Sequence, residues 1–377
     1  MKTGWHSKAL GSLCDILDSK RKPITKKDRT VGEYPYYGAT GIQDFVGDYL
    51  FDEPLILVGE DGAKWGQGEN TAFAAQGKFW VNNHAHVLRP NRSILVDNWL
   101  IYFLVHSDLW EFVSGLTVPK LNQARLREIP IPLPPLPEQH RIVAILDEAF
   151  EGIAIAKANA EKNLKNARAV FESHLNAVFS QRGEGWVEKR LGEIADVQSG
   201  GTPLVSNRDF WAGNIAWYSS GELNNVYTTD PGRHITELGL SNSNAKLHPA
   251  GSLLIGMYDT AAMKMSILDR DAAFNQAISG VKPNEKVDML FIFYSINCIK
   301  ARILAQRRGV RQKNLSLAKI KAIEINVPPL LTQKYLVKVV GDCLKETQRL
   351  ESLYQKKTAA LDQLKQSLLH QAFSGAL

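Results

Sequence analysis

Several segments of this chain combine cations, amides and aromatic rings, which are the side chains that contact nucleic acids. Lysine and arginine neutralise phosphates, whereas arginine, asparagine and glutamine can form paired hydrogen bonds with base edges. A solvated surface loop is the competing explanation for any single cluster. In the first half of the chain the candidate contact residues are Lys20, Arg21, Lys22, Lys26, Lys27, Tyr36, Tyr37, Thr40, Lys64, Trp65, Asn82, Asn83, His84, Lys120 and Asn122. In the second half they are Ser206, Asn207, Arg208, Trp217, Tyr218, Ser219, Asn224, Asn225, Arg307, Arg308, Arg311, Gln312, Lys313 and Asn314.

Two of these clusters recur at the same place in the chain. Lys120 and Asn122 come shortly before one apolar, proline-containing stretch, and Lys313 and Asn314 come shortly before a second. A polar pair that is repeated in this way indicates a shared task. Phosphate contact is one such task, and it positions a protein on DNA without reading the base sequence.

Signatures of catalysis are missing from the sequence. It contains no phosphate-binding loop, no Asn-Pro-Pro-Tyr type of amino-methyltransferase motif, no Gly-x-Ser-x-Gly elbow and no His-Glu-x-x-His helix. His84 and His86 stand two apart on a predicted strand, but a third metal ligand is not evident, which favours ordinary polar contacts. We therefore predict a chain with no catalytic residues, no metal site and no cofactor of its own.

Composition describes an ordinary globular protein with a mild excess of positive charge. The 377 residues have a formal net charge of +6 and a pI of about 9.0, a weak indication of an acidic partner. The three cysteines are far apart in sequence and predict free thiols in a reducing compartment. No leading apolar run and no stretch long enough for a membrane span is evident, so we expect a cytoplasmic protein without membrane contact.

The elements that must position the candidate residues are written twice. Residues 121–181 match residues 315–375 with a constant offset of 194, and the segment that starts at Gly4-Trp5 matches the one at Gly185-Trp186 with an offset of 181. The ends of the unit therefore match, while its middle carries a net insertion of 13 residues in the second copy. The pairs in register include Leu121 and Leu315, Ile129 and Ile323, Pro135 and Pro329, Gln139 and Gln333, Val143 and Val337, and Phe179 and Phe373.

Each repeat ends in a long amphipathic helix that follows a proline-rich turn. Apolar residues recur every three or four positions, from 142 to 178 in one helix and from 336 to 372 in the other, which is typical of a coiled-coil seam. We predict an α+β protein with mixed α/β domains at 1–136 and 183–330. Helices at 137–182 and 331–377 separate them and form an antiparallel coiled coil with internal pseudo-twofold symmetry. The alternative is two helices that each pack on their own domain.

These features together resemble the type I restriction-modification specificity subunits. The resemblance rests on the Leu-Pro-Pro-Leu-Pro-Glu-Gln run that ends at Gln139, on the duplicated helices, and on the Gly-Trp and Leu-Gly pairs that open each repeat. Segments around Tyr36 and around Trp211 also look like recurring parts of the family's target-recognition domains. The second repeat departs from the pattern, because Leu331-Thr332-Gln333 replaces Pro-Glu-Gln, and this predicts a weaker helix start.

The resemblance implies a non-catalytic reader of double-stranded DNA. Each recognition domain would bind one half of a split target, and the helices would set the spacing and dock two methyltransferase subunits, with restriction subunits joining them. S-adenosylmethionine would be bound by the methyltransferases, which flip and modify adenine, and not by this chain. Two other possibilities remain at this stage: a coiled-coil scaffold for proteins without sequence-specific DNA reading, and an enzyme with an unusual motif.

Overall fold

The computed structural model describes residues 5–115, 117–180, 183–305 and 314–377. The chain divides into two compact units, and each contains parts of both long helices, α3 (Leu136–Ser180) and α8 (Leu330–Ser374). Unit 1 comprises Met1–Asn163 and Leu353–Leu377, and unit 2 comprises Leu164–Ser352. None of the described helices is long and apolar enough to cross a membrane.

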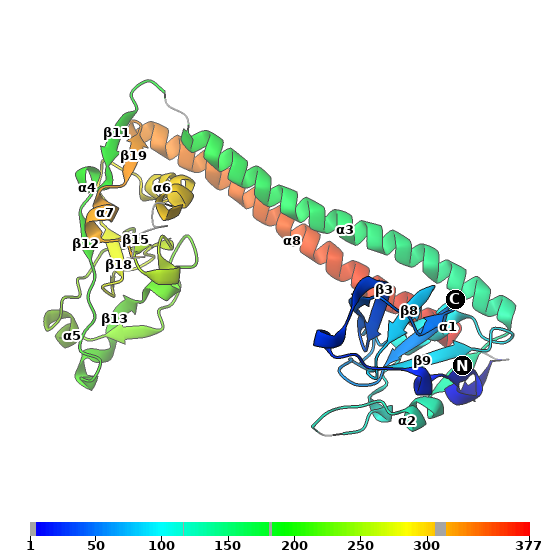
Figure 1. The fold of residues 1–377 in the computed structure, drawn as a ribbon. Helices are drawn as coiled ribbons and strands as arrows, with labels where there is room; N and C mark the ends of the chain where they lie inside the picture. Colours follow the sequence, from blue (N-terminus) through cyan, green and yellow to red (C-terminus); the bar gives the residue numbers. More distant parts are fainter. Residues whose placement is uncertain (1–4, 116, 181–182, 306–313) are drawn as a thin grey trace. The chain divides into compact units, whose positions relative to one another are not determined.

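The described residues of unit 1 form two four-stranded sheets and one two-stranded sheet, and Figure 1 shows where these strands lie. The four-stranded sheets have the strand orders β4-β3-β8-β5 and β2-β9-β6-β7, and the third pairs β1 with β10. Its elements are β1 (His6–Ala9), β2 (Cys14–Ile16), β3 (Val31–Gly38), β4 (Gly41–Val46), β5 (Phe51–Asp52), β6 (Leu55–Gly59), β7 (Ala72–Ala75), β8 (Lys78–Val81), β9 (Ala85–Pro90), α1 (Asp97–His106), α2 (Gln123–Glu128) and β10 (Pro130–Leu133).

Unit 2 has the corresponding sheets, with the orders β14-β13-β17, β12-β18-β15-β16 and β11-β19. Its elements are β11 (Val187–Arg190), α4 (Leu191–Ile194), β12 (Val197–Ser199), β13 (Trp211–Tyr218), β14 (Arg233–Ile235), α5 (Glu237–Ser241), β15 (Leu253–Gly256), β16 (Met265–Ile267), β17 (Ala272–Phe274), β18 (Ile278–Val281), α6 (Met289–Ala305), α7 (Leu317–Lys321) and β19 (Glu324–Val327).

The two units repeat one topology. In both, the sheet that contains β3 or β13 has one strand with an antiparallel neighbour on one side and a parallel neighbour on the other. Strand β3 pairs in this way with β4 and β8, and β13 pairs with β14 and β17. The connections differ more than the strands. Residues 39 and 40 join β3 to β4, whereas residues 219–232 join β13 to β14. The extra residues of the second repeat thus lie between strands. Among the described residues, the sheet around β13 has no counterpart of β5.

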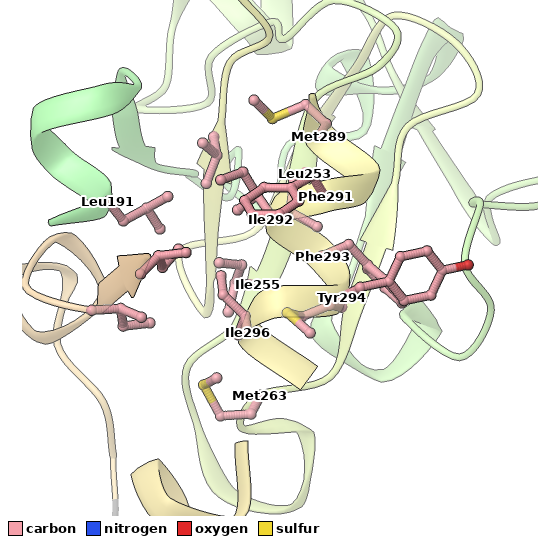
Figure 2. Close-up of a cluster of buried hydrophobic side chains, with 14 of the residues drawn as sticks. Leu191, Leu253, Ile255, Met263, Met289, Phe291, Ile292, Phe293, Tyr294 and Ile296 are labelled. Atoms are coloured by element: carbon pink, nitrogen blue, oxygen red, sulfur yellow. The ribbon is translucent and has the colours of Figure 1, made fainter. Parts of the chain in front are cut away.

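Each unit has a core where a four-stranded sheet packs on a helix. The sheet is β2-β9-β6-β7 in unit 1 and β12-β18-β15-β16 in unit 2. In unit 2, Leu253 and Ile255 from β15 meet Phe291, Ile292 and Ile296 from α6, and all five are buried (Figure 2). In unit 1, Ile56 and Val58 from β6 lie in one cluster with Trp99 and Leu104 from α1. The strand residues are β-branched or leucine, which suits buried sheet positions, and their burial is the main source of stability.

Helices α3 and α8 pair antiparallel, as predicted. In unit 1, Lys157 Nζ lies 2.7 Å from Asp362 Oδ1, and in unit 2, Arg168 Nε lies 2.5 Å from Glu351 Oε1. The residue number rises from 157 to 168 on α3 while it falls from 362 to 351 on α8, so the helices run in opposite directions. The offset of 194 converts Lys157 into Glu351 and Asp362 into Arg168. The two ion pairs are therefore symmetry equivalents with their charges exchanged.

The seam of α3 follows the predicted spacing. In α8 the same spacing of three and four places Lys357 and Leu364 in the seam, and the prediction is wrong at both positions. Lys357 and Leu364 are exposed, and Thr358 and Lys365 are partly buried in their place. A straight α-helix has 3.6 residues per turn, so a strict 3.5-residue repeat drifts out of the contact face over several turns. Thr347 remains in the seam, where its hydroxyl donates to the Cys343 carbonyl at 2.9 Å.

A buried glutamine fixes the start of each long helix. The Gln139 side chain accepts from the Val96 N–H and donates to the Ile94 and Pro134 carbonyls, with all three distances at 2.9 Å. Gln333 likewise accepts from the Asp288 N–H and donates to the Pro328 carbonyl. Each amide therefore satisfies one carbonyl of its proline-rich turn and also ties that turn to the segment just before α1 or α6. The second helix begins at Leu330, which corresponds to Leu136, so the loss of Pro-Glu does not shift its start.

Candidate nucleic-acid interface

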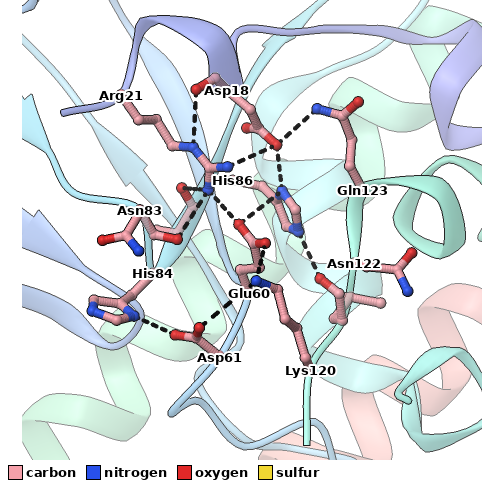
Figure 3. Close-up of polar contacts among 12 residues, drawn as sticks. Asp18, Arg21, Glu60, Asp61, Asn83, His84, His86, Lys120, Asn122 and Gln123 are labelled. Atoms are coloured by element: carbon pink, nitrogen blue, oxygen red, sulfur yellow. Dashed lines mark hydrogen bonds and ion pairs between the residues drawn. The ribbon is translucent and has the colours of Figure 1, made fainter. Parts of the chain in front are cut away.

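A charged network in unit 1 joins four segments that carry predicted contact residues (Figure 3). Glu60, at the end of β6, forms ion pairs with Arg21 and with Lys120, whose Nζ lies 2.8 Å from the carboxylate. Asp61 pairs with His84. Asp18 lies 3.4 Å from Arg21 and accepts a hydrogen bond from Gln123 at 2.9 Å. The network ties these loops to the sheet.

The centre of this network is the fully buried ring of His86 on β9. Its Nδ1 lies 2.6 Å from Asp18 Oδ2, and its Nε2 lies 2.7 Å from the Leu121 carbonyl. Burial alone would raise the pKa of Asp18, but hydrogen bonds from His86, Gln123 and the Val87 N–H outweigh it and lower that pKa. The pKa of Glu60 is lowered against the effect of burial by Lys120 and Arg21. Both carboxylates are therefore held in their charged form.

The network does not have the character of a metal site. Asp18, Glu60 and His86 bring three possible ligand atoms within 4.8 Å of one another. Arg21 and Lys120 already neutralise the carboxylates, however, and both ring nitrogens of His86 are engaged. The sequence predicts both histidines on one strand, and this prediction is wrong for His84, which lies in the turn before β9. The two histidines serve different carboxylates.

An open cleft of about 790 Å³ lies beside this network. Its walls come from loops at the ends of β3, β6 and β8 and from the segment before β3. Arg29 stacks over Tyr36 at 4.3 Å and pairs with Asp44 at 2.9 Å, which fixes one wall. The lining residues are Lys26, Arg29, Gly38, Ala39, Thr40, Gln43, Asp44, Asp61, Gly62, Asn82, His84 and Val118.

The predicted residues of unit 1 fall into three groups. Lys20, Lys22, Lys26 and Lys27 are exposed and form no ion pair among the described residues. Thr40, Asn83 and His84 are exposed at the cleft or beside it, and Lys64 is exposed and lies 3.7 Å from Glu69. The remaining residues support the fold: Arg21, Tyr36, Tyr37, Trp65, Asn82, Lys120 and Asn122.

The supporting residues have identifiable structural tasks. The buried Trp65 ring donates to the Gly59 carbonyl at 3.0 Å, and the Tyr36 hydroxyl accepts from the Ile24 N–H at 2.9 Å. Asn122 caps α2 by accepting from the Arg125 N–H. Its counterpart under the offset of 194 is Ser316, which caps α7 in the same way. The equivalent polar positions that start a short helix are thus Asn122 and Ser316, and not the predicted pair Lys313 and Asn314, of which Lys313 lies outside the described residues.

Unit 2 shows the same division. Trp217 and Tyr218 are buried, and Trp217 donates to the Gly201 carbonyl while Tyr218 donates to the Thr229 carbonyl. Asn207 and Ser219 cap short 3₁₀ helices, and Asn224 accepts from Lys264 at 2.8 Å. Ser206, Arg208 and Asn225 are exposed, as is Asn314. Arg307, Arg308, Arg311, Gln312 and Lys313 lie outside the described residues.

Sequence reasoning missed the partner turn in unit 2. Asn82 follows β8 and accepts from the backbone N–H of His84, and Asn275 follows β17 and accepts from that of Ala277. Next to Asn275, the exposed Gln276 accepts a hydrogen bond from Thr202. Equivalent turns therefore present side-chain amides in both units. The only sequence signal was an Asn shortly before Ala in each copy, and it is visible only once the strands are matched.

Comparison with known proteins gives one consistent result. The family model of the type I restriction modification DNA specificity domain matches residues 2–166 and 183–358. An assigned type I restriction enzyme specificity subunit of Haemophilus influenzae is 27% identical over 88% of this chain and 86% of its own length. The EcoR124I/EcoR124II specificity subunit of Escherichia coli is 30% identical over 57% of this chain and 55% of its own length.

Solved structures share the fold. A chain from a structural study of assembly and conformational transition in the type I restriction-modification system aligns over 100% of this chain and 99% of its own, with a TM-score of 0.78 and 18% identity. The HsdS subunit from Thermoanaerobacter tengcongensis aligns over 100% and 98%, with a TM-score of 0.64 and 18% identity. Because the family model covers both repeats, this chain belongs to the type I restriction-modification specificity subunits, the non-catalytic subunits that recognise the DNA target.

Proposed function

We propose that each globular domain, 1–136 and 183–330, reads one half of a bipartite DNA target. The observation that carries this proposal is the repetition of one sheet topology with divergent loops, each copy matched by the specificity-domain model. Two readers of different half-sites can share one repeated sheet frame, but they need different loops. The bases themselves depend on loop geometry and DNA shape as well as on residue type.

The contact residues that we propose are those that combine exposure with a place at the loop ends. In unit 1 they are Lys20, Lys22, Lys26, Lys27, Thr40, Lys64, Asn83 and His84, together with Gln43 from the cleft. In unit 2 they are Ser206, Arg208, Asn225, Gln276 and Asn314. The lysines suit phosphates, whereas the amides suit base edges. Arg307, Arg308, Arg311, Gln312 and Lys313 remain candidates from sequence.

The long helices, 137–182 and 331–377, would set the half-site spacing and carry the methyltransferases. Val170 on α3 and Leu364 on α8 are equivalent under the offset of 194, and their exposed fractions are 63% and 48%. Exposed apolar residues at equivalent positions provide two like docking points for two like subunits. Those subunits would bind S-adenosylmethionine, and restriction subunits would join the complex in the cytoplasm.

The direct test is a domain replacement in the complete system. Residues 1–136 are exchanged for the corresponding domain of a relative, and methylated sites are mapped by methylome sequencing. We expect one half-site to change while the other half-site and the spacer stay the same. A change in both halves would contradict independent reading, and methylation without any sequence preference would support the scaffold alternative.

A further inference from the structure

Unit 2 contains a pocket that is built partly by the stretch that unit 1 lacks. The connection from β13 to β14 contributes Leu223, Asn224, Asn225 and Val226 to its wall. Lys264 and Met265 at the start of β16 form a second wall, and α6, α3 and α8 complete it. The cavity measures about 360 Å³. This size lies within the range of small-ligand sites.

Two lysines give this pocket an unbalanced positive charge. Lys264 Nζ donates to Asn224 Oδ1 at 2.8 Å, and Lys300 faces the same cavity from α6. Among the described residues, the lining contains no Asp or Glu, and neither lysine forms an ion pair. Burial lowers the pKa of Lys300, and the neighbouring Lys264 lowers it further. An anion bound in this cavity would offset the repulsion between the two ammonium groups.

The rest of the lining fits an anion that carries an organic group. Asn225 and Asn297 form no side-chain hydrogen bond among the described residues and can donate to an acceptor. The floor is apolar and aromatic, with Phe171 from α3 and Phe293 and Tyr294 from α6. Figure 2 shows Phe293 and Tyr294 projecting from α6 away from Leu191, which lies on the core side. The pocket therefore combines ammonium groups, amides and an apolar surface.

We propose that this lysine pocket, defined by Lys264, Lys300, Asn225 and Asn297, binds a phosphate group. A phosphate monoester carries a charge of about −1.5 to −2 and three acceptor oxygens, which matches two ammonium groups and two amides. A phosphodiester of the DNA backbone, like a carboxylate, carries one negative charge and two free acceptor oxygens, so it would satisfy only part of this set. The phosphate can come from a free mononucleotide or from the DNA backbone, and the second source rests on the function proposed above.

Binding is tested on the full chain alone, with inorganic phosphate and adenosine monophosphate as probes. Titration calorimetry is run at constant ionic strength, and thermal midpoints are recorded in phosphate and in chloride. We expect saturable binding that weakens at least about tenfold in Lys300→Met and in Lys264→Met, the loss of one charge-assisted hydrogen bond. Lys286→Gln, at an exposed lysine of the same unit, is the matched control and should bind like wild type.

Stability in phosphate-free buffer separates this site from a structural role. Lys300→Met keeps the aliphatic stem and leaves no acid without a partner, so we expect a thermal midpoint no lower than wild type. Lys300→Arg keeps the charge and should retain binding. Absence of saturable binding by wild type overturns the proposal. Equal binding by wild type and both methionine variants also overturns it.

The source of the phosphate is identified with the methyltransferase complex and cognate DNA. If the backbone supplies it, Lys300→Met should reduce the slope of log affinity against log salt by about 0.9 and leave base preference unchanged. If a mononucleotide supplies it, the slope stays the same and adenosine monophosphate still binds the DNA-bound complex. If Lys300→Met binds phosphate as wild type does but no longer associates with the methyltransferase, the pocket binds an acidic protein segment and the proposal is overturned. Because the titrations use the chain alone, failure of DNA reading does not affect them.

Discussion

At the scale of single residues, the most demanding position is the glutamine that follows each proline-rich turn. Gln139 is fully buried and uses both its oxygen and its nitrogen, so its three backbone partners depend on one side chain. We expect Gln139→Leu to destabilise unit 1 by about 2–4 kcal/mol, because it leaves buried backbone groups unpaired. Chemical denaturation measures the change. His140→Ala, at the adjacent exposed position, should change stability by less than about 0.5 kcal/mol.

A second prediction at this scale concerns Asp18 in the charged network. Its side chain is 6% exposed and faces both His86 and Arg21. We expect Asp18→Asn to cost about 3 kcal/mol, since it removes a buried carboxylate that accepts from His86, Gln123 and the Val87 N–H and lies beside Arg21. Glu53→Gln, which breaks a half-exposed pair with Arg89, is the control and should cost less than about 1 kcal/mol. Equal losses in the two variants would show that the network contributes no more than a surface pair.

The same network predicts an acid dependence of stability. The folded pKa values of Asp18 and Glu60 are lowered, so these carboxylates contribute stability that is fully present above their unfolded pKa of about 4. That contribution is lost as the pH falls through the folded pKa values. Hydrogen exchange of β6 and β9 at several pH values measures it. Asp18→Asn should reduce the loss of stability at low pH. The same loss in wild type and variant would show that other groups cause it.

At the scale of elements, the charges on α3 and α8 specify their pairing. Lys157 faces Asp362 and Arg168 faces Glu351, so cations lie on one helix and acids on the other. A pair of two α3 helices in the same register would oppose Lys157 and Arg168, and a pair of two α8 helices would oppose Glu351 and Asp362. Like charges across a helix pair disfavour that pairing. The exchange of charge between the repeats thus favours the mixed pair.

A charge-swap cycle tests this pairing. Lys157→Glu should lower the free energy of unfolding by about 0.5–1 kcal/mol, a modest effect because both partners are partly exposed. Combining it with Asp362→Lys should restore most of the loss, and the coupling between the two changes is obtained from the four thermal midpoints. Additive losses would show that the ion pair has no part in the helix register.

At the scale of the whole molecule, the prediction concerns spacing. Inserting one heptad in each helix, at equivalent positions, keeps the seam in register and lengthens both helices by about 10 Å. We expect the methylated target to gain spacer base pairs while both half-sites stay the same, as methylome sequencing would show. Insertion of a heptad in α3 alone is the control, because it breaks the register and should abolish methylation. An unchanged spacer would contradict the role of the helices as a ruler.

The sequence by itself determined the features that repeat. A constant offset, the apolar period and the proline-rich turn were enough to predict the duplicated α+β fold, the antiparallel helices and the family. These signals are local or periodic, and a helix of 45 residues states its period many times over. The period does not predict the shift of the α8 seam at Lys357 and Leu364, because it does not show at which residue the contact face moves around the helix.

Only the tertiary structure decided which polar residues are free. Trp65, Tyr218 and Arg21 have the same side-chain chemistry as exposed contact residues, yet burial and ion pairs commit them to the fold. No local sequence pattern singles out Gln276 or Lys300, because their surroundings are built by strands and helices far apart in the chain. Whether a polar group has an internal partner depends on long-range packing, and a single sequence does not record that packing.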